Sequence, residues 1–85
     1  MEEEIQEKLE DVYNLNIDVK FVDFRLYNIY VKIDNERQIS FDFLYDGHNT
    51  LEANLTNIKL KIDNELINLF KKEGKKWNYK KKLKN

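Results

Sequence analysis

Apolar residues recur along residues 49–72 at the spacing of one helical face. They are three or four positions apart, and no glycine or proline interrupts them, which predicts one long amphipathic helix. The stripe consists of Leu51, Leu55, Ile58, Ile62, Leu66 and Leu69. Asn49 is placed to act as the N-cap, and Gly74 follows the last turn as a stop. An alternative stays open, because residues 58–62 alternate strictly and also fit a strand, with Asp63 capping a shorter helix afterwards.

The residues before this helix alternate between apolar and polar with the two-residue period of strands. The predicted strands are residues 17–21, 29–33 and 39–45. The alternation slips phase at Phe21-Val22, which predicts a bulge or the beginning of a turn. Residues 2–13 instead place Ile5, Leu9 and Val12 on one face, which predicts a short first helix.

The predicted order of elements is α-β-β-β-α, an α+β fold. Three consecutive strands with short connections predict an antiparallel meander sheet. Because each strand has one apolar face, we expect the long helix to cover that face and the other face to meet solvent or a second copy of the chain. We expect residues 1–73 to form a single domain with a small core, and residues 74–85 to form a flexible basic tail.

Charge divides the chain into an acidic start and a basic end. Residues 1–14 carry six acids and one lysine, a net charge of −5, and residues 71–85 carry eight lysines and one acid, a net charge of +7. No apolar run approaches the ~18 residues of a membrane-spanning helix, and the acidic start is unlike a signal peptide. We therefore expect a cytoplasmic protein that has no contact with a membrane.

Side chains suited to catalysis or metal binding are sparse. The chain has no cysteine, no glycine-rich phosphate loop and no spacing typical of metal ligands. The single histidine, His48, lies beside Asp46 in a predicted turn, where both residue types are common for backbone reasons. We expect a non-enzymatic protein without cofactor or metal, and this pair is the only catalytic candidate.

The C-terminal segment interleaves lysines with aromatic residues, which supports a nucleic-acid-binding hypothesis. Lysine neutralises phosphates, and tryptophan or tyrosine stacks on unpaired bases. The candidate residues are Lys75, Lys76, Trp77, Tyr79, Lys80, Lys81 and Lys82. The element order is also that of the double-stranded-RNA-binding domain. That domain opens its last helix with a lysine cluster, and residues 49–53 contain no lysine, so we reject this assignment.

The solvent-facing side of the sheet supports a second hypothesis, a protein-binding surface. Tyrosines are enriched in interfaces, and the acids of the loop after the second strand would imitate a phosphate backbone. Such a surface would occupy the basic channel of a nucleic-acid-binding partner. The candidate contact residues are Tyr30, Asp34, Asn35, Glu36, Asp42 and Tyr45.

A family resemblance is carried by the element order and by two short stretches. These are residues 29–35 and the run in which Phe70-Lys71-Lys72 precedes Gly74 and Trp77-Asn78. In these features the chain resembles small phage-encoded anti-CRISPR proteins that inhibit Cas9 and have an acidic α-β-β-β-α architecture. The resemblance implies a protein that blocks a CRISPR effector where DNA would bind. The frequent use of Lys, Asn, Ile and Glu is also typical of AT-rich bacterial and phage genes.

We therefore predict a binding protein of phage or mobile-element type that inhibits or adapts a host macromolecule. The alternative is a small nucleic-acid-binding protein that uses its lysine-rich tail.

Overall fold

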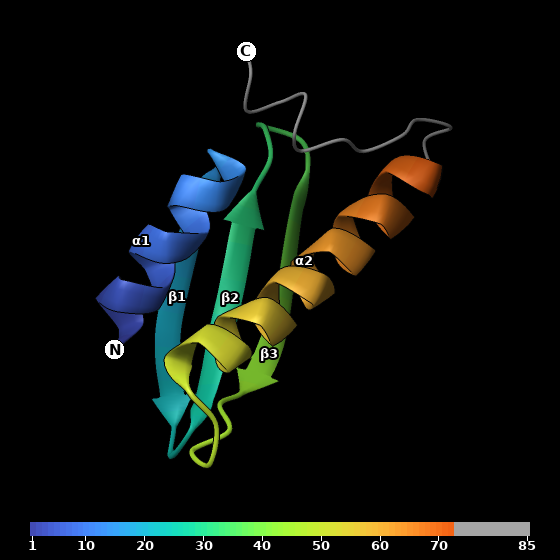
Figure 1. Ribbon diagram of the computed structural model, residues 1–85. Helices are drawn as coiled ribbons and strands as arrows, with labels where there is room; N and C mark the ends of the chain where they lie inside the picture. The colour runs from blue at the N-terminus through green and yellow to red at the C-terminus, as the bar shows by residue number, and fades with distance from the viewer. Residues whose placement is uncertain (73–85) are drawn as a thin grey trace.

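The computed structural model describes residues 1–72 and shows a three-stranded sheet with two helices on one face (Figure 1). Its elements are α1 (Glu2–Tyr13), β1 (Asn16–Asp23), β2 (Leu26–Lys32), β3 (Gln38–Leu44) and α2 (Leu51–Lys72). The predicted α-β-β-β-α order and the α+β class are confirmed.

The sheet is an antiparallel meander with the strand order β1-β2-β3. The register pairs Val19 with Ile29 and Ile29 with Phe41, so the apolar positions of all three strands point to the same face. The register of β1 shifts between Phe21 and Asp23, at the predicted phase slip. This irregularity leads directly into the β1–β2 turn.

Helix α2 continues through residues 58–62, so the strand alternative for this segment is wrong. The predicted N-cap is also wrong, because the helix begins at Leu51 and its cap is Thr50. The hydroxyl oxygen of Thr50 accepts a hydrogen bond from the N–H of Ala53 at 3.1 Å. Asn49 instead donates its side-chain N–H to Asp46, inside the preceding turn. The predicted stop at Gly74 lies outside the described residues.

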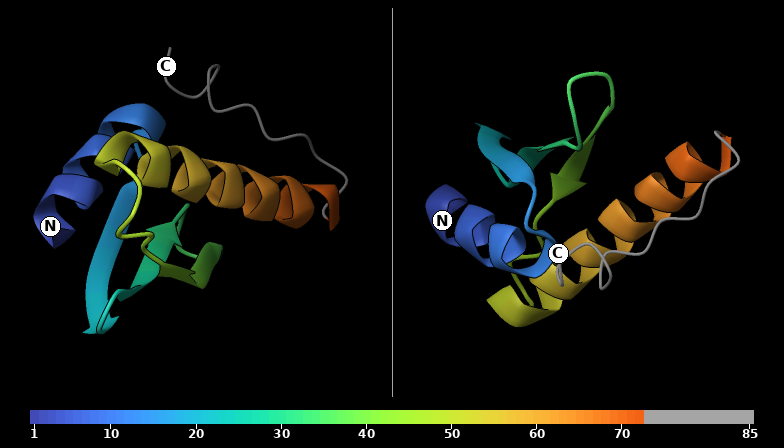
Figure 2. Two further views of the ribbon diagram at one scale, coloured as in Figure 1. Left: turned by 60° about the horizontal axis from the view of Figure 1, so that its bottom comes forward. Right: turned by 90° about the horizontal axis from the view of Figure 1, so that it is seen from above.

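Both helices cover the apolar face of the sheet, although the sequence pattern indicated only the long one. Helix α1 lies along β1, and α2 crosses the sheet diagonally (Figure 2). The buried core joins side chains of α1, the strands and α2, including Ile5, Leu9, Ile29, Val31, Ile58, Ile62 and Leu66. Among the predicted core residues, Phe21 is an exception, because half of its surface is exposed.

Tyr13, at the end of α1, links the two helices. Its ring is buried, and the single proton of its hydroxyl group is shared between two acceptors, the carbonyl oxygen of Lys59 at 3.0 Å and Asp63 Oδ1 at 2.8 Å. Because a buried hydroxyl needs partners, these contacts fix the end of α1 against the middle of α2. The sequence pattern of residues 2–13 did not show this role.

Side chains of α1 also cover the outer edge of β1. Three acceptors on successive helical turns receive the outward-facing N–H groups of the strand. The pairs are Ile17 N–H to Glu10 Oε2 (3.5 Å), Val19 N–H to Gln6 Oε1 (3.1 Å) and Phe21 N–H to Glu2 Oε2. An exposed row of backbone donors would otherwise attract another strand. Helix α1 therefore protects this edge of the sheet.

Candidate interaction surface

The sheet face opposite the helices carries polar side chains from all three strands. We call it the open face, and its members are Asp18, Lys20, Asn28, Tyr30, Lys32, Ser40 and Asp42. Asn28 lies at its centre. The Asn28 side-chain amide donates to Ser40 Oγ at 3.2 Å and to Asp42 Oδ1 at 3.1 Å, which orders the β2–β3 half of this face.

The structure brings together only some of the predicted partner-binding residues. Tyr30 and Asp42 share the open face, on adjacent strands and neighbouring rows. Tyr45 lies elsewhere, because its ring packs edge-on against Tyr27 on the helix-covered side, with the ring centroids 6.2 Å apart. The acids of the β2–β3 loop lie at the opposite end of β3 from Tyr45, so the length of the strand separates them.

Asp34 is engaged inside the β2–β3 loop. Its Oδ1 accepts hydrogen bonds from the N–H groups of Glu36 and Arg37, both at 2.9 Å, and its Oδ2 accepts from Arg37 Nε at 2.9 Å. The guanidinium carbon of Arg37 in turn lies 4.8 Å from the centroid of the Phe70 ring, near the end of α2. The loop is thus fixed to α2, and it presents the side chains of Asn35 and Glu36 to solvent.

These contacts predict an acid-dependent stability. The hydrogen bonds from Arg37 and from the loop backbone lower the pKa of Asp34 from 3.8 to about 2. A lowered carboxyl pKa stabilises the folded state above pH 3.8, and this contribution disappears as the pH falls towards 2. We expect Asp34→Asn to lower the melting temperature at neutral pH and to flatten its fall between pH 4 and pH 2.

Glu36→Gln is the matched control, since Glu36 is an exposed acid of the same loop. Between pH 4 and pH 2, the melting temperature of Glu36→Gln should fall as steeply as that of the wild type. If the melting temperatures of the wild type and Asp34→Asn fall equally steeply with pH, the Asp34 contacts do not persist in solution.

The end of the sheet at the β1–β2 turn exposes four large apolar side chains. We call this group the hairpin patch, and its members are Phe21, Val22, Phe24 and Leu44. Phe24 is 75% exposed and Leu44 is 62% exposed. Neighbouring apolar residues exposed at this level are typical of interaction sites. Sequence reasoning missed this surface, although the phase slip at Phe21-Val22 marks its beginning.

Phe24 has an unusual backbone conformation in this patch. Its φ angle is 56°, in the left-handed region that glycine and asparagine occupy far more readily than phenylalanine. The guanidinium carbon of Arg25 lies 4.9 Å from the ring centroid of Phe24. The Arg25 carbonyl accepts the Tyr45 N–H at 2.8 Å, which fixes the turn against the end of β3. The chain thus holds an exposed aromatic ring on a strained backbone.

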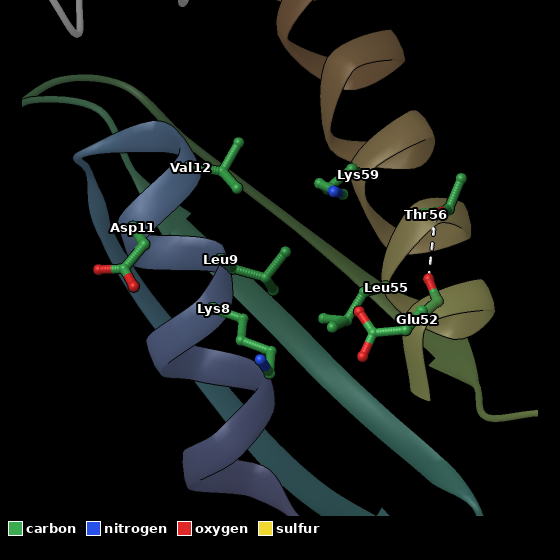
Figure 3. A pocket seen from close by; sticks show the side chains of 8 residues that line it. All are labelled: Lys8, Leu9, Asp11, Val12, Glu52, Leu55, Thr56 and Lys59. Atoms are coloured by element: carbon green, nitrogen blue, oxygen red, sulfur yellow. Dashed lines mark hydrogen bonds between the residues drawn. The ribbon is translucent and has the colours of Figure 1, made fainter. Parts of the chain in front are cut away.

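A groove lies between the two helices on the helix-covered side of the sheet (Figure 3). It has a volume of about 290 Å³, and both helices contribute four residues to its walls. Leu9 and Leu55 form its apolar floor, while two acids and two lysines surround it. Because these opposite charges balance, the groove concentrates neither sign and does not select an ionic ligand.

The histidine–aspartate pair serves the turn before α2. Asp46 Oδ1 accepts the backbone N–H of His48 at 2.9 Å, and Asp46 Oδ2 accepts the Asn49 amide at 2.8 Å. The Asp46 carboxylate therefore binds the turn and does not orient the imidazole. Within residues 1–72, no three His, Cys, Asp or Glu side chains form a group able to hold a metal ion.

Two further expectations concern the membrane and the tail. No helix in the described part of the chain is long and apolar enough to cross a membrane. The nucleic-acid-binding candidates of the tail, from Lys75 to Lys82, lie outside the described residues.

Comparisons with models of protein families, with curated proteins and with solved structures found no match to this chain. The fold and surface therefore define its class, a small α+β protein with a two-helix layer on one sheet face and an open, mixed polar and apolar surface on the other.

Proposed function

We propose that this chain is a non-enzymatic binding protein that docks on a macromolecular partner through the hairpin patch and the adjoining open face. The observation that carries this proposal is Phe24, an exposed aromatic residue in a left-handed conformation. Such strain is concentrated at functional sites, and aromatic residues are frequent hot spots of interfaces. The backbone strain in the turn is therefore the physical reason to assign this end of the sheet to binding.

The charge of the folded part indicates the chemistry of the partner. Residues 1–72 contain fifteen acids and nine bases, a net charge of −6. The acidic start of α1 lies at the hairpin end, since Glu2 accepts the N–H of Phe21, and Glu3, Glu4 and Glu7 are exposed beside it. An acidic surface around an apolar patch favours a partner with a basic binding surface.

In its finer form, our proposal is that the chain inhibits a host nucleic-acid-binding protein by occupying its basic surface. A CRISPR effector is the partner that the family resemblance implies. The acidic folded part and the apolar anchor support this form together, because the charges would steer the encounter and the aromatic ring would supply affinity.

Phe24→Gly should separate binding from stability. Glycine adopts a positive φ angle without steric strain, so we expect the free energy of unfolding to rise by about 1 kcal/mol. Loss of the exposed ring should weaken partner binding by about tenfold or more, as at a typical hot spot. Urea unfolding measures the first effect, and affinity capture with quantitative mass spectrometry measures the second.

The capture experiment uses a bacterial lysate, with and without nuclease treatment, and three proteins: the wild type, Phe24→Gly and Leu60→Ala. Leu60 is the control because it is 57% exposed on α2, outside the hairpin patch. One stoichiometric protein retained by the wild type and Leu60→Ala, and lost with Phe24→Gly, supports the proposal. Equal retention by all three refutes it, and binding that disappears with nuclease favours the lysine-rich tail. Inhibition of DNA cleavage by a purified Cas9 then tests the finer form.

A further inference from the structure

The two edges of the sheet differ in whether their outward backbone groups have hydrogen-bond partners. The outward N–H groups of β1 bind side chains of α1. In β3, the register directs Ile39, Phe41 and Phe43 towards β2, so the backbone groups of Ser40 and Asp42 face outward. Within residues 1–72, these outward groups have no hydrogen-bond partner. The edge of β3 is therefore open to another strand.

The apolar side chains of β3 are also less covered than those of β2. Tyr27, Ile29 and Val31 are buried in β2, whereas Phe41 and Phe43 are only half-buried in β3. Lys61 Nζ lies 5.3 Å from the centroid of the Phe41 ring. A further strand beside β3 would bury these two rings on the helix side of the sheet.

A hollow lies beside the first residues of this open edge. The C-terminal half of α2 extends past β3, which is visible in both Figure 1 and Figure 2. Between them lies a hollow of about 290 Å³, lined by Gln38, Ile39, Ser40, Glu65, Asn68, Leu69 and Lys72. Its walls are a strand edge and a helix, which is the arrangement that receives an added strand in β-augmentation.

We propose that β3 pairs antiparallel with β3 of a second copy, about a two-fold axis through Phe41. The strand is self-complementary in this register. Ser40 stands opposite Asp42 of the other copy on the open face, and Phe41 stands opposite its own mate on the helix side. The outcome is a six-stranded sheet in which both edges of the original three-stranded sheet are covered.

Hydrogen bonding and charge select this register among its neighbours. All seven residues of β3 pair, and the outward groups of Ser40 bond those of Asp42 in the other copy. A shift that centres the pair on Asp42 would place two carboxylates face to face, which is destabilising. A shift that centres it on Ser40 would leave Leu44 outside the paired segment. The register centred on Phe41 avoids both defects, and this self-complementarity of β3 favours a second copy over an unrelated peptide.

The test is analytical ultracentrifugation of the full chain with charges placed at Ser40. Ser40→Lys sets a lysine against Asp42 of the other copy twice per dimer, so we expect the dissociation constant to fall about fivefold. Ser40→Asp sets two carboxylates against each other twice, so it should raise that constant about fivefold. Asn16→Lys and Asn16→Asp introduce the same charges on β1, and both should leave the dissociation constant unchanged.

A cysteine variant tests the axis directly, because the chain contains no cysteine. Phe41→Cys should form an intermolecular disulfide under mild oxidation, whereas Ser40→Cys and Asp42→Cys should not, since only residue 41 meets its own copy. A chain that stays monomeric at millimolar concentration overturns the proposal. It is equally overturned if Ser40→Lys and Ser40→Asp shift the dissociation constant in the same direction, or if the Asn16 variants shift it as strongly.

Discussion

Asn54→Leu is expected to lower the free energy of unfolding by about 3 kcal/mol, because three buried hydrogen bonds of about 1 kcal/mol each are lost. Asn54 is the buried polar residue of α2. Its Oδ1 accepts the N–H of Asp46 at 2.8 Å, and its Nδ2 donates to the carbonyls of Asp46 at 3.0 Å and Thr50 at 2.9 Å. Leucine would fill similar space but leave the N–H of Asp46 without an acceptor, and the two carbonyls would keep only their backbone donors, the N–H groups of Asn49 and residue 54.

Asn57→Leu is the matched control, since Asn57 is an exposed asparagine three residues further along the same helix. Its free energy of unfolding should stay within about 0.5 kcal/mol of the wild type. Urea unfolding followed by circular dichroism measures both variants. If Asn54→Leu unfolds at the wild-type urea concentration, the side chain does not hold the β3–α2 connection in the way that the structure shows.

The role of Asn54 also shows where sequence reasoning stops. Periodicity assigned the stripe of α2 correctly, because apolar spacing depends only on helix geometry. Asn54 lies beside that stripe as an ordinary polar residue, and its partners come from a turn whose backbone path the sequence did not give. The prediction of Asn49 as the N-cap failed for the same reason, since asparagine and threonine are both good caps and the turn decides that Thr50 is the one used.

The packing of the helices on the sheet illustrates a second limit of prediction from the sequence. The pattern of α1 predicted an apolar face, and the strands predicted another, but neither said which elements meet. The structure places α1 along β1, where Gln6 and Glu10 bind the strand edge. This pairing of helix side chains with backbone N–H groups depends on tertiary geometry. No local pattern would have indicated it from the sequence alone.

The candidate surface was predicted in part. Strand alternation correctly placed Tyr30 and Asp42 on the open face, because side chains alternate across any strand. It also placed Tyr45 close to the strand end but could not show that its ring turns towards Tyr27. Phe24 was missed because a positive φ angle at phenylalanine contradicts residue preference, and such exceptions are expected at functional sites.

Ile62→Ala and Leu60→Ala should have very different effects, and the difference tests the helix at the ambiguous segment. Ile62 is fully buried in the core, so its truncation should lower the free energy of unfolding by about 3 kcal/mol. Leu60 is mostly exposed, so its truncation should lower it by less than about 1 kcal/mol. In a strand, residues 58, 60 and 62 would share one face, and both truncations would destabilise the protein alike. Urea unfolding separates these outcomes, with Ile58→Ala expected to match Ile62→Ala. If Leu60→Ala lowers the free energy of unfolding as much as Ile62→Ala does, residues 58–62 are not part of the continuous helix on which the core is built.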